Sequence, residues 1–375
     1  MADEILIHEI DTLAEYAGRH CDLSHCVIQG LDLSEQAACL GQADLVGAVF
    51  LGCRFASADE EDGLRRRGAL IFPRFVGLPY DPYRHSLYTR AELMDGYEPG
   101  TEDLSIDKRI YDHFVAHGRH HAGVLEAIAQ RIHDHAVENA LDNLLAGTPG
   151  EGVKRVVGIM GGHGTPRSDD SFEKVARVSR GLTQRGYFVT TGGGPGTMEA
   201  GNFGAYMAEA SEEEFAWALE TLQEAPTYTD AGYIEQAAKV VERFPIGCDS
   251  LAVPTWFYGH EPSNWFSNHI AKYFSNSLRE DGLLEISLYG VVFAPGSAGT
   301  TQEIFMDATQ NHYKTFGQIS PMIFLGSQRY VAETGLFPML QNLARGHEYA
   351  DHLHLTDDPD AVMEIVANFH PGGAA

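Results

Sequence analysis

The sequence predicts an α/β fold, a doubly wound parallel sheet of the Rossmann-like kind, over residues 151–375. Two observations predict it. The strands expected there carry almost no polar residues, as in RVVGIMGG (155–162), YFVTT (187–191) and GVVFAP (290–295), which is typical of strands buried on both faces. Segments with helical spacing of apolar residues separate them, and such alternation indicates a parallel sheet covered by helices on both sides.

The elements of this domain follow in a regular order. We expect helices from Phe172 to Gln184 and from Met198 to Ala210, then an acidic helical insertion at 211–244. A further helix is expected from Asn264 to about Arg279, with its N-cap at Asn264. The remaining predicted elements are strands at 246–253, 321–326 and 352–356, and helices that begin at Thr301, after 326 and at Pro359.

Residues 1–60 contain a faint five-residue repeat. Its large apolar positions are Leu23, Ile28, Leu33, Leu40, Leu45, Phe50 and Phe55, and the positions two residues before each are mostly small. This resembles the pentapeptide repeat, in which both positions point into a narrow right-handed β-helix. Seven units would make fewer than two coils, too few to be stable alone. We interpret the segment as a cap or interaction surface, with coincidence as the alternative.

Residues 61–150 are predicted to form a connector followed by a helical segment. The connector is rich in Pro, Gly and Tyr, and apolar residues recur at helical spacing from Ile106 to Leu145. His113 and His117 are four residues apart and could share a metal ion, but no carboxylate or cysteine completes a ligand set. We therefore predict a polar helix face or a subunit contact, and no metal site.

The composition excludes several classes of protein. A formal net charge of -27 argues against a surface that follows a nucleic-acid backbone. No apolar run approaches the length needed to span a membrane, and the N-terminus lacks a signal-peptide pattern. The five cysteines lack C-x-x-C spacing, which argues against a disulfide framework or structural zinc. We expect a cytoplasmic protein.

Three glycine-rich turns follow predicted strands: GGHGTPRS at 161–168, TGGGPGTMEA at 191–200 and PGSAGTTQE at 295–303. Loops after the carboxyl ends of parallel strands line one crevice, so we expect the three to converge. Glycines let the backbone approach a ligand, and the following helix presents N–H groups to an anion. Neither a G-x-x-x-x-G-K-[ST] nor a G-x-G-x-x-G pattern is complete, which disfavours ATP hydrolysis and nicotinamide chemistry.

The pair GGGPGTMEA and PGSAGTTQE resembles the paired motifs of the LOG family, the lysine-decarboxylase-like phosphoribohydrolases, over most of residues 154–369. Within that family the chain is most similar to the bacterial pyrimidine/purine nucleotide 5′-monophosphate nucleosidases. Those also have GGH after the first strand, matched by Gly161 to His163. They share an EPxN stretch, matched by EPSN from Glu261, that leads into a helix ending on an arginine, matched by Arg279.

The resemblance implies hydrolysis of the N-glycosidic bond of a nucleoside 5′-monophosphate, giving a free base and ribose 5-phosphate, without a cofactor. Glu303 would face the ribose, with Arg279 beside it. The residues implied in phosphate or substrate binding are Gly162, His163, Gly193, Gly194, Gly196, Thr197, Glu199, Gly296, Ser297, Ala298, Gly299 and Thr300. LOG-like enzymes are generally dimers or larger, so we expect a homo-oligomer.

Physical chemistry supports this assignment for Glu303. Cleavage passes through a cation-like sugar, which a carboxylate beside C1′ stabilises. The alternative is a first-turn acid favoured by the helix dipole, and Arg279 could equally be a surface helix-end cation. Glu199 has the same ambiguity and could contact substrate across a subunit boundary. Asp249 and Glu261 are secondary candidates.

Two departures from the family pattern bear on activity. Ser297 stands where the family usually has a glycine, and a positive φ there would strain a serine. One extra residue also separates Arg279 from Pro295. The alternative function is a non-catalytic nucleotide-binding sensor or carrier that uses the same loops. Amino-acid decarboxylation is remote, because only Lys272 lies near these loops in sequence to carry pyridoxal.

Overall fold

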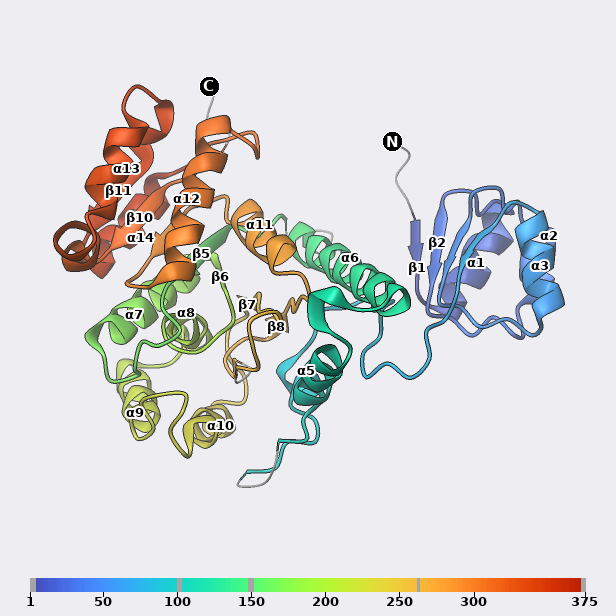
Figure 1. Ribbon diagram of the computed structural model, residues 1–375, viewed down its shortest axis with the longest axis horizontal. Coiled ribbons are helices and arrows are strands. Elements are labelled where there is room, and N and C mark those ends of the chain that lie inside the picture. The colour runs from blue at the N-terminus through green and yellow to red at the C-terminus, as the bar shows by residue number, and fades with distance from the viewer. Residues whose placement is uncertain (1–4, 100–102, 148–151, 262–263, 372–375) are drawn as a thin grey trace. The chain divides into compact units, whose positions relative to one another are not determined.

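The computed structural model describes residues 5–99, 103–147, 152–261 and 264–371. The chain forms two compact units, Met1–Leu87 with Val115–Leu141, and Tyr88–Phe114 with Asp142–Ala375. Figure 1 traces the chain through both, and each unit is described here by itself. Among the described residues, no helix is long and apolar enough to cross a membrane.

The first unit is built on a parallel sheet of four strands in the order β1 (Ile5–Ile7), β2 (Cys26–Gln29), β3 (Val49–Leu51) and β4 (Leu70–Phe72). Val27 pairs with Val49, so one coil of chain spans 22 residues. The helices between the strands are α1 (Ile10–His20), α2 (Ala37–Gln42) and α3 (Ala58–Arg66).

This architecture corrects the expected narrow β-helix of fewer than two coils. Helices replace part of each coil, and the sheet continues past residue 60 to Phe72. The large positions of the repeat still point inward: Leu23, Ile28, Leu33, Leu40, Leu45 and Phe50 are all buried. Aspartates fix the turns, because Asp22 and Asp44 each accept a hydrogen bond from the backbone two residues later.

The helix predicted from 106 to 145 is interrupted. α5 (Ile106–Ala116) and α6 (Val124–Ala146) are separated by the short 3-10 turn Arg119–His121. Gly118, at φ 91°, sets the break, because a positive φ ends a right-handed helix. The helix therefore breaks at Gly118, although apolar residues at helical spacing continue on both sides of it. A short helix, α4 (Arg90–Leu93), precedes α5.

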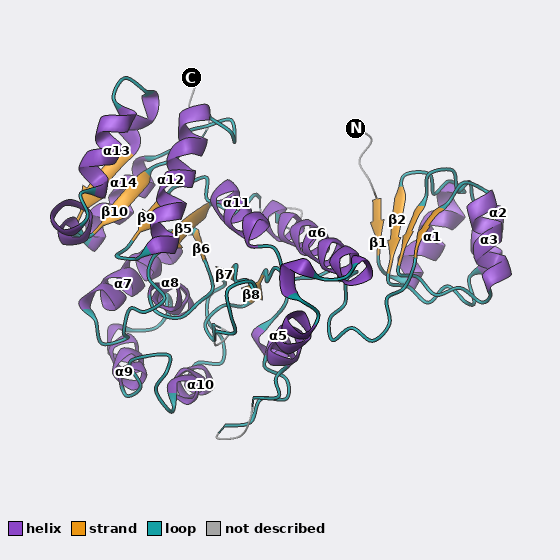
Figure 2. Cartoon of the chain, in the orientation of Figure 1, coloured by secondary structure: helices purple, strands orange, loops and turns teal. Residues whose placement is uncertain are grey.

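The second unit contains a seven-stranded parallel sheet (Figure 2). Its strand order is β11 (Leu353–Thr356), β10 (Met322–Leu325), β9 (Val291–Phe293), β5 (Val156–Met160), β6 (Phe188–Thr191), β7 (Leu251–Ala252) and β8 (His269–Ile270). From β5 the chain adds strands toward β8, then returns to β9 and adds strands toward β11. The order reverses between β5 and β9, so the predicted doubly wound Rossmann-like fold is confirmed.

Helices cover the two faces of this sheet. Those of the first half are α7 (Asp170–Gln184) and α8 (Thr197–Tyr206), and the last helix, α14 (Pro359–Asn368), packs on α7. α11 (Asn276–Ile286) and α12 (Ala298–Tyr313) belong to the return path and lie on the other face, as right-handed crossovers require. The core contains side chains such as Val157, Phe172 and Phe203. α13 (Leu336–Ala344) follows a π-helical turn at Gln328–Glu333.

One predicted helix is wrong. Residues 269–270 form β8 at the edge of the sheet, and the helix begins only at Asn276, so Arg279 lies in its first turn and not at its end. Ile270, Tyr273 and Phe274 are buried, and their tertiary contacts outweigh the helical spacing. The insertion expected at 211–244 contains α9 (Glu212–Gln223) and α10 (Tyr233–Arg243).

Candidate active site

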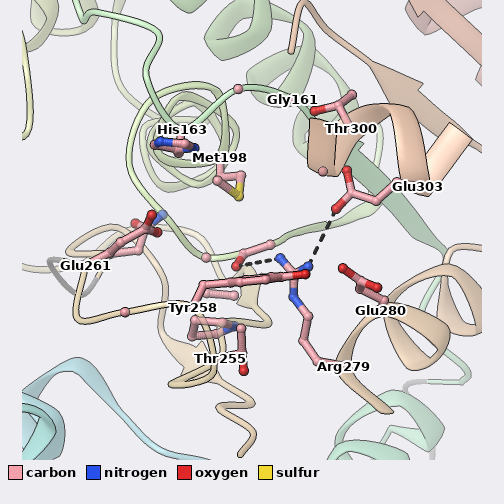
Figure 3. A pocket seen from close by; sticks show the side chains of 18 of the residues that line it. Gly161, His163, Met198, Thr255, Tyr258, Glu261, Arg279, Glu280, Thr300 and Glu303 are labelled. Carbon is pink, nitrogen blue, oxygen red and sulfur yellow. Dashed lines mark hydrogen bonds and ion pairs between the residues drawn. The ribbon is translucent and has the colours of Figure 1, made fainter. Parts of the chain in front are cut away.

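A pocket lies at the point where the strand order reverses. The loops after β5 and β9 meet there, and the N–H of Gly162 donates to the carbonyl of Pro295 at 3.0 Å. The predicted site residues that line the pocket are Gly162, His163, Gly193, Arg279, Ser297, Gly299, Thr300 and Glu303. The loops after β5, β6 and β9 therefore reach one cavity, drawn in Figure 3.

The loop after β9 brings the N-terminus of α12 to the pocket. Gly296 packs so closely that a Cβ there would lie 2.1 Å from Oγ1 of Thr300. Ser297 is the N-cap residue, and its φ of −114° lies outside the positive region that favours glycine, so the strain expected for a serine at positive φ does not arise. Early N–H groups of a helix have no partner within it, which suits this end of α12 to an anion.

The loop after β6 supplies fewer of the residues that line the pocket than expected. The N–H of Thr197 already donates to the carbonyl of Gly162 at 3.1 Å, so the first loop covers the start of α8. Two observations explain glycine at position 196: its φ is 69°, and a Cβ would lie 2.5 Å from that same carbonyl oxygen. Of the predicted residues, Gly194, Gly196, Thr197, Glu199, Gly296 and Ala298 are not among the described residues that line the pocket.

Arg279 is fixed by backbone carbonyls. Its Nε donates to Val253 at 2.8 Å and its Nη2 donates to Gly192 at 3.2 Å, at the ends of two neighbouring strands. Gly192 leaves room for this guanidinium, since a Cβ there would lie 2.2 Å from Nη2. Arg279 is therefore a buried cation held in one orientation, and not an exposed helix-end charge.

Glu303 lies beside this arginine. Its Oε1 is 3.6 Å from Nη1 of Arg279, and the side chain is almost fully buried while still lining the pocket. Burial raises the pKa of Glu303 to about 7, Arg279 opposes that rise and the nearby Glu280 adds to it. Because α12 begins at Ala298, Glu303 stands in the second turn, so the first-turn dipole alternative is wrong.

Glu199 has a structural role. Arg167 donates to both of its carboxylate oxygens, from Nη2 at 2.5 Å and from Nε at 2.8 Å, and the hydroxyl of Tyr233 donates at 2.6 Å. The guanidinium also donates to the carbonyl of Ala225. This buried cluster ties the insertion to α8 and to the loop after β5, and Glu199 is not among the described residues that line the pocket.

Of the remaining candidate site residues, some line the pocket and one does not. Asn264 lines the pocket but is not a helix cap: its side chain donates to Asn202 and accepts from the N–H of Phe266. Glu261 lines the pocket, whereas Asp249 lies at the surface beside His269. The EPSN motif continues into residues 262–263, which lie outside the described part of the chain.

Several residues that line the pocket were not predicted as site residues. Lys272 reaches the pocket while its Nζ is held 2.7 Å from Oδ1 of Asp107, which α5 supplies. Glu280 and Tyr258 also line it. A glutamate directly after Arg279 could have been noticed, but no local pattern pairs Lys272 with a residue 165 positions away. Within the described residues, no group of three or more His, Cys, Asp or Glu side chains could hold a metal.

Comparison with known proteins gives neither a matching family model nor a matching curated protein. Among solved structures, the chain is similar to the molybdenum cofactor binding protein of the phototrophic bacterium Rippkaea orientalis (14% identity, TM-score 0.37, 57% of this chain and 96% of that one). It is also similar to the Moco carrier protein of Chlamydomonas reinhardtii (16% identity, TM-score 0.37, 58% and 99%). At these values the likeness concerns the fold alone.

Proposed function

We propose that this protein binds a nucleoside 5′-monophosphate in the pocket and hydrolyses its N-glycosidic bond. The observation that carries the proposal is Glu303: a carboxyl with its pKa raised to about 7, in the wall of a glycine-lined pocket beside a fixed arginine. A carboxyl that titrates near neutral pH in a cavity is typical of acid–base chemistry. The LOG-like motifs of the sequence support the same assignment.

In this proposal the phosphate lies against the loops after β5 and β9. The N-terminus of α12 supplies N–H donors, and Gly162 and Gly299 leave room for the phosphate oxygens. Binding energy from the phosphate fixes the sugar against Glu303. The carboxylate then stabilises the cation-like sugar and orients the attacking water, while Arg279 holds the carboxylate in place.

The second candidate is a carrier or sensor that binds a phosphate-bearing small molecule in the same pocket without turnover. The similar solved structures are a molybdenum cofactor binding protein and a Moco carrier protein. Arg279 already faces Glu303 and donates to two carbonyls, an arrangement that a binding protein could use to shape a rigid pocket. Both functions require the same loops, so only turnover separates them.

The deciding experiment incubates the purified protein with AMP, GMP, CMP and UMP and measures free base and ribose 5-phosphate by mass spectrometry. We expect release from at least one nucleotide. The control is Glu303→Gln, which should bind that nucleotide in calorimetry and release nothing. Binding without release by the wild-type protein would overturn hydrolysis in favour of the carrier, and normal turnover by Glu303→Gln would overturn the assigned role of Glu303.

Two further expectations stay proposals. We expect a homo-oligomer, which light scattering at several protein concentrations would test.

We also expect activity to survive a chelator, because the proposed chemistry uses only side chains and water. Loss of activity in chelator, restored by one added metal ion, would require a different mechanism.

A further inference from the structure

Three charged side chains meet in one wall of the pocket. Figure 3 shows the carboxylates of Glu303 and Glu280 on the same side of the cavity as the guanidinium of Arg279. All three residues line the pocket and are buried, with 7% of Glu303, 4% of Glu280 and 8% of Arg279 exposed. Two buried carboxyls therefore share the neighbourhood of a single cation.

Glu280 is held in this position from two sides. It follows Arg279 on α11, and its Oε2 accepts a hydrogen bond of 2.5 Å from Nε2 of Gln302 on α12. Gln302 directly precedes Glu303, so α12 supplies both the donor to one carboxylate and the other carboxyl. Among the described residues, Gln302 donates to Glu280 and not to Glu303, so the two carboxyls differ in their hydrogen-bond partners.

The other groups around Glu303 do not balance two negative charges. Lys272 also lines the pocket, but its Nζ lies 2.7 Å from Oδ1 of Asp107, and the buried Asp307, one turn further along α12, brings no positive charge. Tyr258, from the loop after β7, and Tyr330, from the π-helical turn, interact with Glu303 electrostatically. The pKa of each is raised, so both stay neutral near pH 7. With one arginine for two buried carboxylates, retaining one proton avoids an uncompensated buried charge.

We propose that Glu280 and Glu303 form a carboxyl pair that holds one proton at neutral pH, with this proton on Glu303. This inference deepens the proposed function and rests on it for its chemical meaning. Glu280 acts through Glu303 and is a positioning residue for that proton. The pair suits a substrate whose leaving group must be protonated, which is the case for a nucleobase.

The proton then has a defined path. As the C1′–N bond breaks, its electron pair goes to the base nitrogen, which takes the proton from Glu303. The new carboxylate faces the positive charge that develops on the sugar. Water forms the C1′–O bond, and its proton returns to Glu303. The pair therefore holds one proton before and after the reaction.

The test measures the proton on Glu303 without substrate. Infrared spectra of the full-length protein are recorded across pH, and the band of the protonated Glu303 carboxyl is identified as the one absent from Glu303→Gln. In Glu280→Gln, loss of the neighbouring negative charge should lower the titration midpoint of this band by at least about one pH unit, a tenfold change in the dissociation constant. Glu285→Gln, the same substitution at an exposed position of α11, should leave the midpoint unchanged.

A second variant covers the case in which Glu280→Gln fails to fold. Gln302 is exposed, and Gln302→Leu removes its hydrogen bond to Glu280 while both carboxyls remain. The shared proton should then move toward Glu280, and the midpoint of the Glu303 band should again fall. An unchanged or raised midpoint in either folded variant would overturn the pair.

This outcome is separate from that of the nucleotide panel. Base release together with an unshifted midpoint would refute the carboxyl pair alone. A shifted midpoint without release from any nucleotide would support the pair as a property of the pocket and refute hydrolysis.

Discussion

Two glutamates of this protein begin from similar sequence patterns and end in different roles. Glu199 follows the glycine loop after β6, and Glu303 follows the one after β9. Each is buried, and each faces an arginine. Arg167 grips both oxygens of Glu199 at 2.5 and 2.8 Å, whereas Arg279 stands 3.6 Å from one oxygen of Glu303.

The difference lies in how many partners each carboxylate has. Glu199 accepts hydrogen bonds from Arg167 and Tyr233 and is not among the described residues lining the pocket. The nitrogens of Arg279 are directed to carbonyls, so Glu303 keeps an incomplete partner set and borders the cavity. A saturated buried pair stabilises the fold, whereas an unsaturated carboxyl at a cavity is available to a ligand.

The largest effect is expected from Glu303→Gln. Gln keeps the shape of the side chain but can neither exchange a proton nor carry the negative charge, so turnover should fall by about 10²–10⁴-fold. Release of ribose 5-phosphate, compared with nucleotide binding by calorimetry, measures this. The variant should also be no less stable than wild type at pH 7, and a large loss of stability would place Glu303 in the same class as Glu199.

Glu199→Gln should instead destabilise the protein. It leaves Arg167 buried with an incomplete counter-charge, a loss expected to cost about 3–5 kcal/mol in the free energy of unfolding. Denaturant titration measures it. The matched control is Glu212→Gln, because Glu212 also bridges two arginines, Arg177 and Arg180, but its side chain is 60% exposed. That change should cost no more than about 1 kcal/mol, and equal losses would contradict the distinction.

A third buried carboxyl shows what burial does without an arginine. Asp307 follows Glu303 by one turn of α12, and burial raises its pKa from 3.8 to about 8. The folded protein therefore keeps a proton that the unfolded chain loses. Asp307 therefore contributes to the free energy of unfolding through this proton. The contribution is fully present below pH 3.8 and is lost as the pH rises to about 8.

Asp307→Asn should remove this loss. Across that window, wild-type stability should fall relative to the variant by up to about 1.4 kcal/mol per pH unit. Denaturant titrations of both proteins at several pH values measure the difference. For Glu303, with Arg279 beside it, the corresponding loss should end near pH 7. A variant whose stability follows the same pH dependence as wild type would contradict the buried proton on Asp307.

Local sequence patterns predicted the strands of the central sheet well. These strands are buried on both faces, so each appears in the sequence as a short run of consecutive apolar residues. β5, β6, β9, β10 and β11 all lie within predicted strands. The glycine loops were predictable for a similar reason, since strand, turn and helix are adjacent in sequence. Partners distant in sequence were not predictable: Arg167 meets Glu199 across 32 residues, and tertiary packing turned residues 269–270 into a strand.

The smallest effect is expected at Ser297, the residue that starts α12. Ser297 stands at the N-cap position of α12 with φ −114°, and among the described residues its side chain makes no capping hydrogen bond. Ser297→Gly should therefore change turnover by less than about twofold and lower stability by no more than about 1 kcal/mol, through backbone entropy.

At the N-cap of α8, in contrast to that of α12, the backbone conformation requires a glycine. Gly196 has φ 69°, and a Cβ would lie 2.5 Å from the carbonyl oxygen of Gly162. Gly196→Ser should therefore disturb the loop that the pocket shares, with a clear loss of both stability and nucleotide binding. Thermal unfolding and calorimetry on the two reciprocal variants would compare them directly. A large gain in turnover from Ser297→Gly would mean that the serine restrains the loop after β9, and that the two glutamates differ in the freedom of their loops as well as in their partners.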